Sequence, residues 1–117
     1  MKICAVVLDY RGAERTEQCL RSLNNQGINA VLIVDNSADE AASIALDLAV
    51  RNLMQGDLDY VAKMIRPNDN LGFSHGVNRA LNDEHARDCD AFLLINNDAT
   101  AGHITQHEIR HRNACDY

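Results

Sequence analysis

Four short apolar runs divide this chain, and each is followed by a cluster of polar residues. The runs cover residues 3–8, 30–34, 60–65 and 91–95. Three of them are continuously apolar, which is the pattern of strands that are covered on both faces. The run at 60–65 alternates more between apolar and polar residues, which favours a strand nearer the edge of a sheet.

The segments between these runs carry apolar residues at helical spacing. They cover about residues 13–23, 39–55 and 73–81, with Gly27 and Gly56 in the positions of C-terminal caps for the first two. The second helix has two apolar sets, one of Ile44 and Leu48 and another of residues 46, 49, 50 and 53. Strands that alternate with helices predict an α/β domain with a parallel sheet, right-handed crossovers and helices on both faces.

The composition of the chain limits the kinds of molecule that it binds and indicates the cellular compartment. The 117 residues form one domain, and a net charge of −6 argues against a nucleic-acid backbone or an anionic membrane as the main partner. The four cysteines, at positions 4, 19, 89 and 115, contain no C-x-x-C pair, which favours reduced thiols over a disulfide framework or a zinc site. Because no apolar run has the length of a membrane span or of a signal-peptide core, we expect a cytoplasmic protein.

Polar side chains follow three of the predicted strands. The clusters are Asp9 to Arg11, Asp35 to Ser37, and Asn96 to Asp98. In a parallel sheet the three converge on one edge, where open α/β sheets place their ligands. Asp35 is placed to accept hydrogen bonds from a nucleotide base or a ribose hydroxyl, and Asn97 and Asp98 are placed to meet a divalent cation on a diphosphate. The alternative for residues 35–37 is a turn that caps the second helix.

The segment from Asn68 to Arg79 contains a second group of candidate ligand-binding residues. Gly72 and Gly76 permit a close backbone approach, and Asn70, Asn78 and Arg79 offer donors to phosphate or sugar oxygens. The alternative is a long turn with a helix N-cap at Ser74, which leaves Asn78 and Arg79 unexplained.

These segments resemble the N-terminal, nucleotide-binding half of inverting family 2 glycosyltransferases, which have the GT-A fold. The matching pieces are VVLDYRGAERTEQCLRSL, VLIVDNSADE, NDNLGFSHGVNRAL and FLLINNDA, between position 5 and about position 99, and the likeness is strongest to the rhamnosyltransferase-like branch. The resemblance implies a three-layer Rossmann-like sandwich with a mostly parallel sheet of about four strands in the order 3-2-1-4. It also implies a nucleoside-diphosphate sugar as ligand and Mg²⁺ or Mn²⁺ as cofactor, with Asp98 as the metal ligand. The implied donor-binding residues are Leu8, Asp9, Tyr10, Arg11, Asp35, Asn36, Asn70, Gly72, Phe73, Asn78, Arg79, Asn96 and Asn97.

The chain departs from this family after the metal motif. Family members continue well beyond that motif into an acceptor-binding half that supplies the catalytic base, and this chain offers Glu108 and Asp116 with nothing to place them. We therefore expect a donor-binding half-domain at residues 1–102 that is truncated after the metal motif, with no catalytic residue assigned and transferase activity left open. The alternatives are a non-catalytic remnant or binding module with this fold, and a different nucleotide-binding α/β protein such as a response-regulator-like domain.

The remaining residues, 103–117, are expected to form a divergent helical tail. Its His103, His107 and His111 recur every four residues, so on a helix they either bind a transition metal or form a solvated polar face. The strand at residues 91–95 is interior in the family, so here its open edge would need a cover. Either the tail helix or a second copy of the chain would cover it, and we expect a homodimer because the tail is too polar to cover the edge well.

Overall fold

The sheet of the computed structural model has the order that was expected. The structure describes residues 2–67, 72–96 and 109–111, with the backbone alone described at 72–74, 85, 96 and 109–111. The strands are β1 (Ile3–Asp9), β2 (Ala30–Asp35), β3 (Val61–Ile65), β4 (Ala91–Asn96) and β5 (Ile109–His111). They form one sheet in the order β3-β2-β1-β4-β5, in which the first four strands are parallel and β5 runs antiparallel to β4. The predicted parallel order 3-2-1-4 is confirmed, and β3 lies at an edge.

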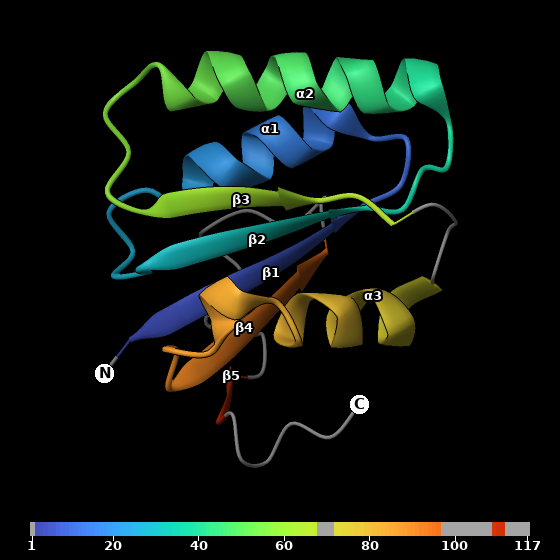
Figure 1. Cartoon of the computed structure of the whole chain (residues 1–117). Helices are drawn as coiled ribbons and strands as arrows, with labels where there is room; N and C mark the ends of the chain where they lie inside the picture. Colours follow the sequence, from blue (N-terminus) through green and yellow to red (C-terminus); the bar gives the residue numbers. More distant parts are fainter. Residues whose placement is uncertain (1, 68–71, 97–108, 112–117) are drawn as a thin grey trace.

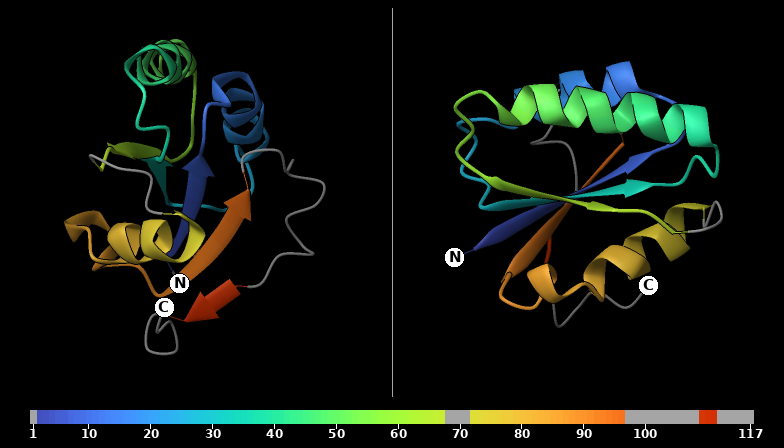
Figure 2. Two further views of the ribbon diagram at one scale, coloured as in Figure 1. Left: turned by 90° about the vertical axis from the view of Figure 1, so that its right-hand side faces the viewer. Right: turned by 45° about the horizontal axis from the view of Figure 1, so that its top comes forward.

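Helices cover both faces of this sheet, so the fold has three layers. The helices α1 (Ala13–Ser22) and α2 (Glu40–Met54) lie together on one face, and α3 (Gly72–Leu81) lies on the other (Figures 1 and 2). A short 3₁₀ turn, Glu84–Ala86, follows α3. Asp39 caps α2 by accepting a hydrogen bond from the backbone N–H of Ala42 at 2.9 Å, which satisfies one of the free donors in the first turn.

Alternation along β1 explains why two separate cores form. Ala5 and Val7 belong to the core beneath α1 and α2, whereas Cys4 and Val6 belong to the core beneath α3. Successive side chains of a strand point to opposite faces, so a continuously apolar strand supplies both layers at once. The continuous runs of the sequence therefore correspond to the interior strands.

Two expectations about local secondary structure differ from the structure: the end of the first helix and the conformation of residues 109–111. The α1 helix ends at Ser22 with Leu23 as its C-cap, so Gly27 does not cap it but takes a left-handed φ of 78° in the turn before β2. Residues 109–111 form strand β5 rather than part of a helix, because their backbone pairs with residues 91–93 of β4. His111 is therefore a strand residue here, and His103 and His107 lie outside the described residues.

The edge of β4 for which we expected a second copy of the chain is paired with β5 over residues 91–93. The reason given for a homodimer at this edge, an uncovered strand, does not hold for that part of β4. In the described part of the chain, no helix combines the length and the apolar character needed to cross a membrane.

Candidate functional site

Two aspartates mark the carboxyl ends of β1 and β2, side by side. Asp9 is the register partner of Asp35, and each residue is buried with 1 % of its surface exposed. The asparagine that follows, Asn36, is also buried, and its backbone N–H donates to the carbonyl of Asp9 at 2.8 Å. Two of the three strand-end clusters are therefore adjacent, as parallel pairing requires.

The carboxylate of Asp9 holds the loops that leave the sheet. It accepts a hydrogen bond from the hydroxyl of Thr16 on α1 at 2.5 Å and a longer one, 3.4 Å, from the hydroxyl of Ser37. The Ser37 hydroxyl in turn accepts from the backbone N–H of Arg11 at 2.8 Å. Arg11 has φ 52° and Ala38 has φ 50°, left-handed values that cost free energy for residues other than glycine. The hydrogen bonds of Asp9 and Ser37 help to hold this strained backbone in place.

Two residues of the first cluster face solvent instead. Tyr10 is 56 % exposed, and the guanidinium of Arg11 lies 5.4 Å from the centroid of the Tyr10 ring. An exposed aromatic ring with a cation over it is free to contact a planar or anionic ligand at this edge of the sheet.

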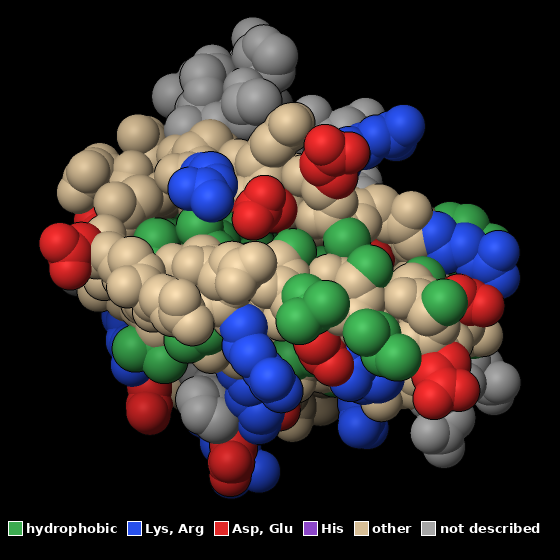
Figure 3. Space-filling view, turned by 90° about the horizontal axis from the view of Figure 1, so that it is seen from above, with side chains coloured by type: hydrophobic (Ala, Val, Ile, Leu, Met, Phe, Trp, Pro, Cys, Tyr) green, Lys and Arg blue, Asp and Glu red, His purple; other side chains and the backbone are tan. Residues whose placement is uncertain are grey.

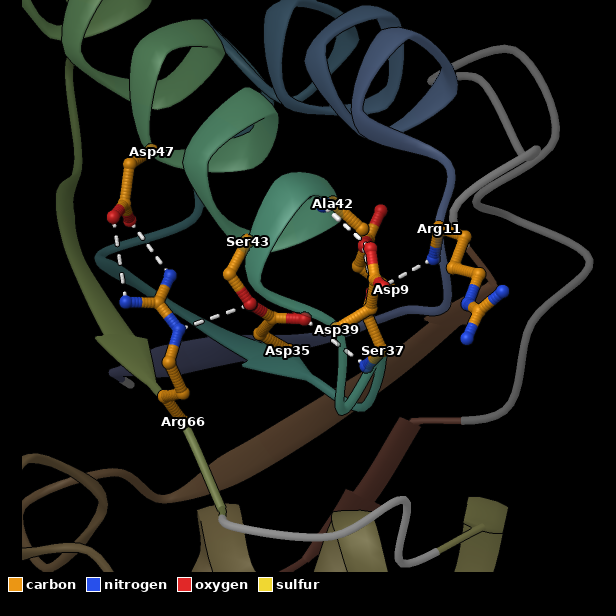
Figure 4. Close-up of polar contacts among 9 residues, drawn as sticks. All are labelled: Asp9, Arg11, Asp35, Ser37, Asp39, Ala42, Ser43, Asp47 and Arg66. Atoms are coloured by element: carbon orange, nitrogen blue, oxygen red, sulfur yellow. Dashed lines mark hydrogen bonds and ion pairs between the residues drawn. The ribbon is translucent and has the colours of Figure 1, made fainter.

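The carboxylate of Asp35 is fully surrounded by protein donors. Its Oδ1 accepts from the backbone N–H of Ser37 at 3.0 Å, and its Oδ2 accepts from the Ser43 hydroxyl at 2.6 Å and from Arg66 Nε at 3.0 Å (Figure 4). The side chain has 0 % of its surface exposed. Burial acts to raise the pKa of Asp35, but these hydrogen bonds outweigh it and hold the pKa below the ordinary value of 3.8.

Arg66, which the sequence analysis did not include among the site residues, bridges two carboxylates. It is the first residue after β3, and its guanidinium extends between Asp35 and Asp47 (Figure 4). Its Nη2 and Nη1 donate to the two oxygens of Asp47 at 2.7 and 3.3 Å. These hydrogen bonds with Asp47, followed by that with Asp35, raise the pKa of Arg66. The rule that strand ends carry ligand-facing residues would have found Arg66 if applied to the third strand as well.

A hollow of about 330 Å³ lies beside this network. Its lining combines four carboxylates with one arginine, one serine and three apolar side chains. The lining residues are Asp35, Ala38, Asp39, Glu40, Ser43, Ile44, Asp47, Arg66 and Pro67. A hollow bordered by carboxylates suits a ligand that presents N–H or O–H donors, such as a nucleobase or a sugar.

The helix α3 packs against the opposite face of the sheet, close to the same carboxyl edge. A Cβ built at Gly76 would lie 2.9 Å from Asn36 Nδ2 and 2.9 Å from Leu8 Cδ2, so only glycine allows this approach. Leu8, Asn36 and the middle of α3 are therefore brought together. Asn78 is half-buried and Arg79 exposed. Within the part of the chain that the structure describes, neither side chain has a hydrogen bond to the residues at the strand ends.

The remaining predicted site residues are described in part or not at all. The backbone of Asn96 ends β4 and is in register with Leu8, so the chain leaves β4 at the same sheet edge as Asp9. Gly72 and Phe73 are the first two residues of α3, with the backbone alone described. Asn70, Asn97 and Asp98 lie outside the described residues. Within residues 2–67, 72–96 and 109–111, no group of three or more His, Cys, Asp or Glu side chains is arranged to hold a metal ion.

This architecture, with its polar strand ends at one edge of a parallel sheet, is a Rossmann-like α/β fold. Among solved structures it matches the mannosyltransferase PcManGT from Pyrobaculum calidifontis in complex with GDP-Man and Mn²⁺, with a TM-score of 0.67 and 18 % sequence identity. The match covers 85 % of this chain and 28 % of that protein, so the chain spans less than a third of its length. The chain therefore has the fold of a glycosyltransferase. No protein-family model and no curated protein matches it.

Proposed function

We propose that this chain is the donor-binding part of a glycosyltransferase and binds a nucleoside-diphosphate sugar at the carboxyl edge of its sheet. The observation that carries the proposal is the shared fold with a mannosyltransferase that was solved with GDP-Man and Mn²⁺. The meeting of Asp9, Asp35 and the end of β4 at one edge supports it, because ligands of open α/β sheets bind there. The sequence motifs further favour an inverting family 2 enzyme of the rhamnosyltransferase-like branch.

The bound nucleotide would interact with different groups at this edge. The carboxylate-rich hollow beside Asp35 suits the N–H donors of a base, and the exposed ring of Tyr10 offers a stacking surface. Asp35 itself accepts three hydrogen bonds from the protein, so direct contact with a base requires one of these donors to move. Arg66 is the donor with the most exposed side chain, at 40 %.

Asp98 is the residue that we propose to hold Mg²⁺ or Mn²⁺, with Asn96 and Asn97 beside it. One carboxylate flanked by amides is a set of hard oxygen donors, which suits such a cation when diphosphate oxygens complete the coordination. The cation would neutralise charge on the leaving diphosphate during sugar transfer with inversion to an acceptor hydroxyl. Among the described residues, Cys4, Cys19 and Cys89 are buried and none forms a disulfide, which fits the reducing cytoplasm.

Calorimetric titration of the chain with UDP, dTDP and GDP, each with and without Mn²⁺, tests the proposal. Metal-dependent binding of one nucleotide is the expected result, and Asp98→Ala should remove the metal dependence while the fold, monitored by circular dichroism, stays intact. Asp57→Ala removes the same charge at an exposed position before β3, at the opposite edge of the sheet, and serves as the matched control. Absence of binding to all three nucleotides would contradict the proposal.

A non-catalytic binding module with this fold is the second candidate function. The observation that favours it is that the Asp35 carboxylate already accepts three hydrogen bonds from the protein. A buried aspartate with such a set of donors can have a purely structural role. A folded chain that binds no nucleotide in the same titration would select this alternative.

A further inference from the structure

The helix α2 carries a second apolar face that points away from the sheet. Its inner face buries Leu46, Val50 and Leu53 against the sheet and α1. On the outer face, however, Ile44 is 53 % and Leu48 55 % exposed. Ala41 and Ala45 are exposed beside them, so the outer apolar residues recur at the spacing i, i+3, i+4, i+7 of a helix that packs on another helix.

Charged residues stand at the two ends of this outer face. Glu40 and Arg51 lie three helical turns apart, about 16 Å along the axis, and both are on the same flank of the Ile44–Leu48 row. Both are exposed, and neither has an ion pair with another described residue. Figure 3, which looks down on this layer, shows hydrophobic side chains over α2 with charged side chains around them. Asp47, which lies on the same flank, is already held by Arg66.

The arrangement is complementary to itself under a two-fold axis. The midpoint between Ile44 and Leu48 and the midpoint between Glu40 and Arg51 nearly coincide, between residues 45 and 46. An axis perpendicular to α2 at that point would place Ile44 of one copy against Leu48 of the other, twice. The same axis would place Glu40 against Arg51, also twice, because a two-fold interface repeats each contact.

We propose that the outer face of α2 is a self-association surface, on which a second copy of this chain packs its α2 in the antiparallel direction. Ala45 lies close to the axis, and its small side chain lets the two helices approach to a usual packing distance of about 8–10 Å. One helix pair buries less area than a standard stable interface, so the association is reversible and depends on concentration. The inference does not rest on the proposed nucleotide site, but its surface shares Glu40 and Ile44 with the lining of the hollow beside Asp35, so association is measured without nucleotide.

Sedimentation equilibrium of the full chain over a range of concentrations tests the proposal through charge reversal. Glu40→Arg and Arg51→Glu should each raise the dimer dissociation constant by about tenfold, because each replaces two attractions by two repulsions. The double variant E40R/R51E should restore the original dissociation constant, since the two pairs are then reversed together. Restoration by a second charge change is not expected of a variant that merely unfolds, and thermal melting by circular dichroism checks each fold.

Matched controls separate this specific contact from net charge. Glu14→Arg and Arg15→Glu change the same charges at exposed positions of α1 and should leave the dissociation constant unaltered. Leu48→Gln should weaken association without any change in charge. A chain that remains monomeric at every concentration would overturn the proposal, as would a double variant no better than the single ones; either result assigns the exposed row to a different partner or to none.

Discussion

The two carboxylates that share Arg66 differ in burial, and this difference predicts very different effects of the same substitution. The side chain of Asp35 is 0 % exposed and accepts three hydrogen bonds, whereas that of Asp47 is 39 % exposed and contacts the outer side of the guanidinium. Replacing each by asparagine keeps the shape of the side chain and removes the charge. The pair of variants therefore compares a buried and an exposed ion pair on one arginine.

The expected loss in the free energy of unfolding depends on how well water can solvate the arginine that each substitution leaves without its ion pair. Breaking a buried ion pair costs about 3–5 kcal/mol, because the remaining partner keeps its desolvation penalty. Arg66 is 40 % exposed and regains some water, so we expect the lower end, a loss of about 3 kcal/mol, for Asp35→Asn. An exposed pair contributes about 0–1 kcal/mol, so Asp47→Asn should cost less than about 1 kcal/mol.

Urea denaturation followed by circular dichroism at pH 7 measures both losses. Because the pKa of Asp35 is lower in the folded than in the unfolded chain, its contribution is complete above the unfolded pKa and is lost as the pH falls through the folded pKa. The difference between the native chain and Asp35→Asn should therefore shrink below about pH 4. Equal losses for the two variants at pH 7, or a difference that does not change with pH, would refute the reasoning.

Two further substitutions test contacts on either face of the sheet. Gly76→Ala should lower the free energy of unfolding by about 1–2 kcal/mol, because overpacking against Leu8 and Asn36 outweighs the higher helix propensity of alanine. Gly56→Ala is the control: its new methyl group would have its nearest contact at 3.4 Å, so the free energy of unfolding should change by less than about 0.5 kcal/mol. Tyr60→Phe removes the hydrogen bond from the phenol to the Leu20 carbonyl at 2.8 Å and should cost about 1 kcal/mol in urea denaturation. Burial raises the pKa of Tyr60 to about 12, so its contribution should be lost as the pH rises from about 10 towards 12 in the native chain and not in the variant.

The parts of the fold that the sequence predicts are those governed by local pattern. The continuous apolar runs identify β1, β2 and β4 because an interior strand needs apolar side chains on both faces, and the alternation at residues 61–65 identifies the edge strand β3. Asp9 and Asp35 were predicted to converge because the carboxyl ends of parallel strands share an edge. The strand assignments need only the periodicity of each segment, and the convergence of Asp9 and Asp35 follows from the alternation of strands and helices along the chain.

The parts that could not be predicted depend on contacts between distant segments. Nothing in the residues around Arg66 shows that it pairs with Asp47 of a helix that precedes it along the chain. The tail at residues 103–117 was expected to be helical, yet backbone pairing with β4 makes residues 109–111 a strand. Glycine is the residue type preferred just after a helix, but α1 ends at Ser22, and Gly27 instead adopts a left-handed conformation in the turn before β2.

The central position of β1 has a consequence for how the chain folds during synthesis. β1 is made first, but one of its two neighbours, β4, is made after α2, β3 and α3. Until the ribosome has released Ala91 to Asn96, the backbone N–H and C=O groups on that edge of β1 have no strand partner. Synthesis proceeds at about 5–20 residues per second, so this interval lasts several seconds. The emerging β3-β2-β1 sheet is thus open at the strand that later becomes its middle, and this interval is when an encounter with another nascent chain is most damaging.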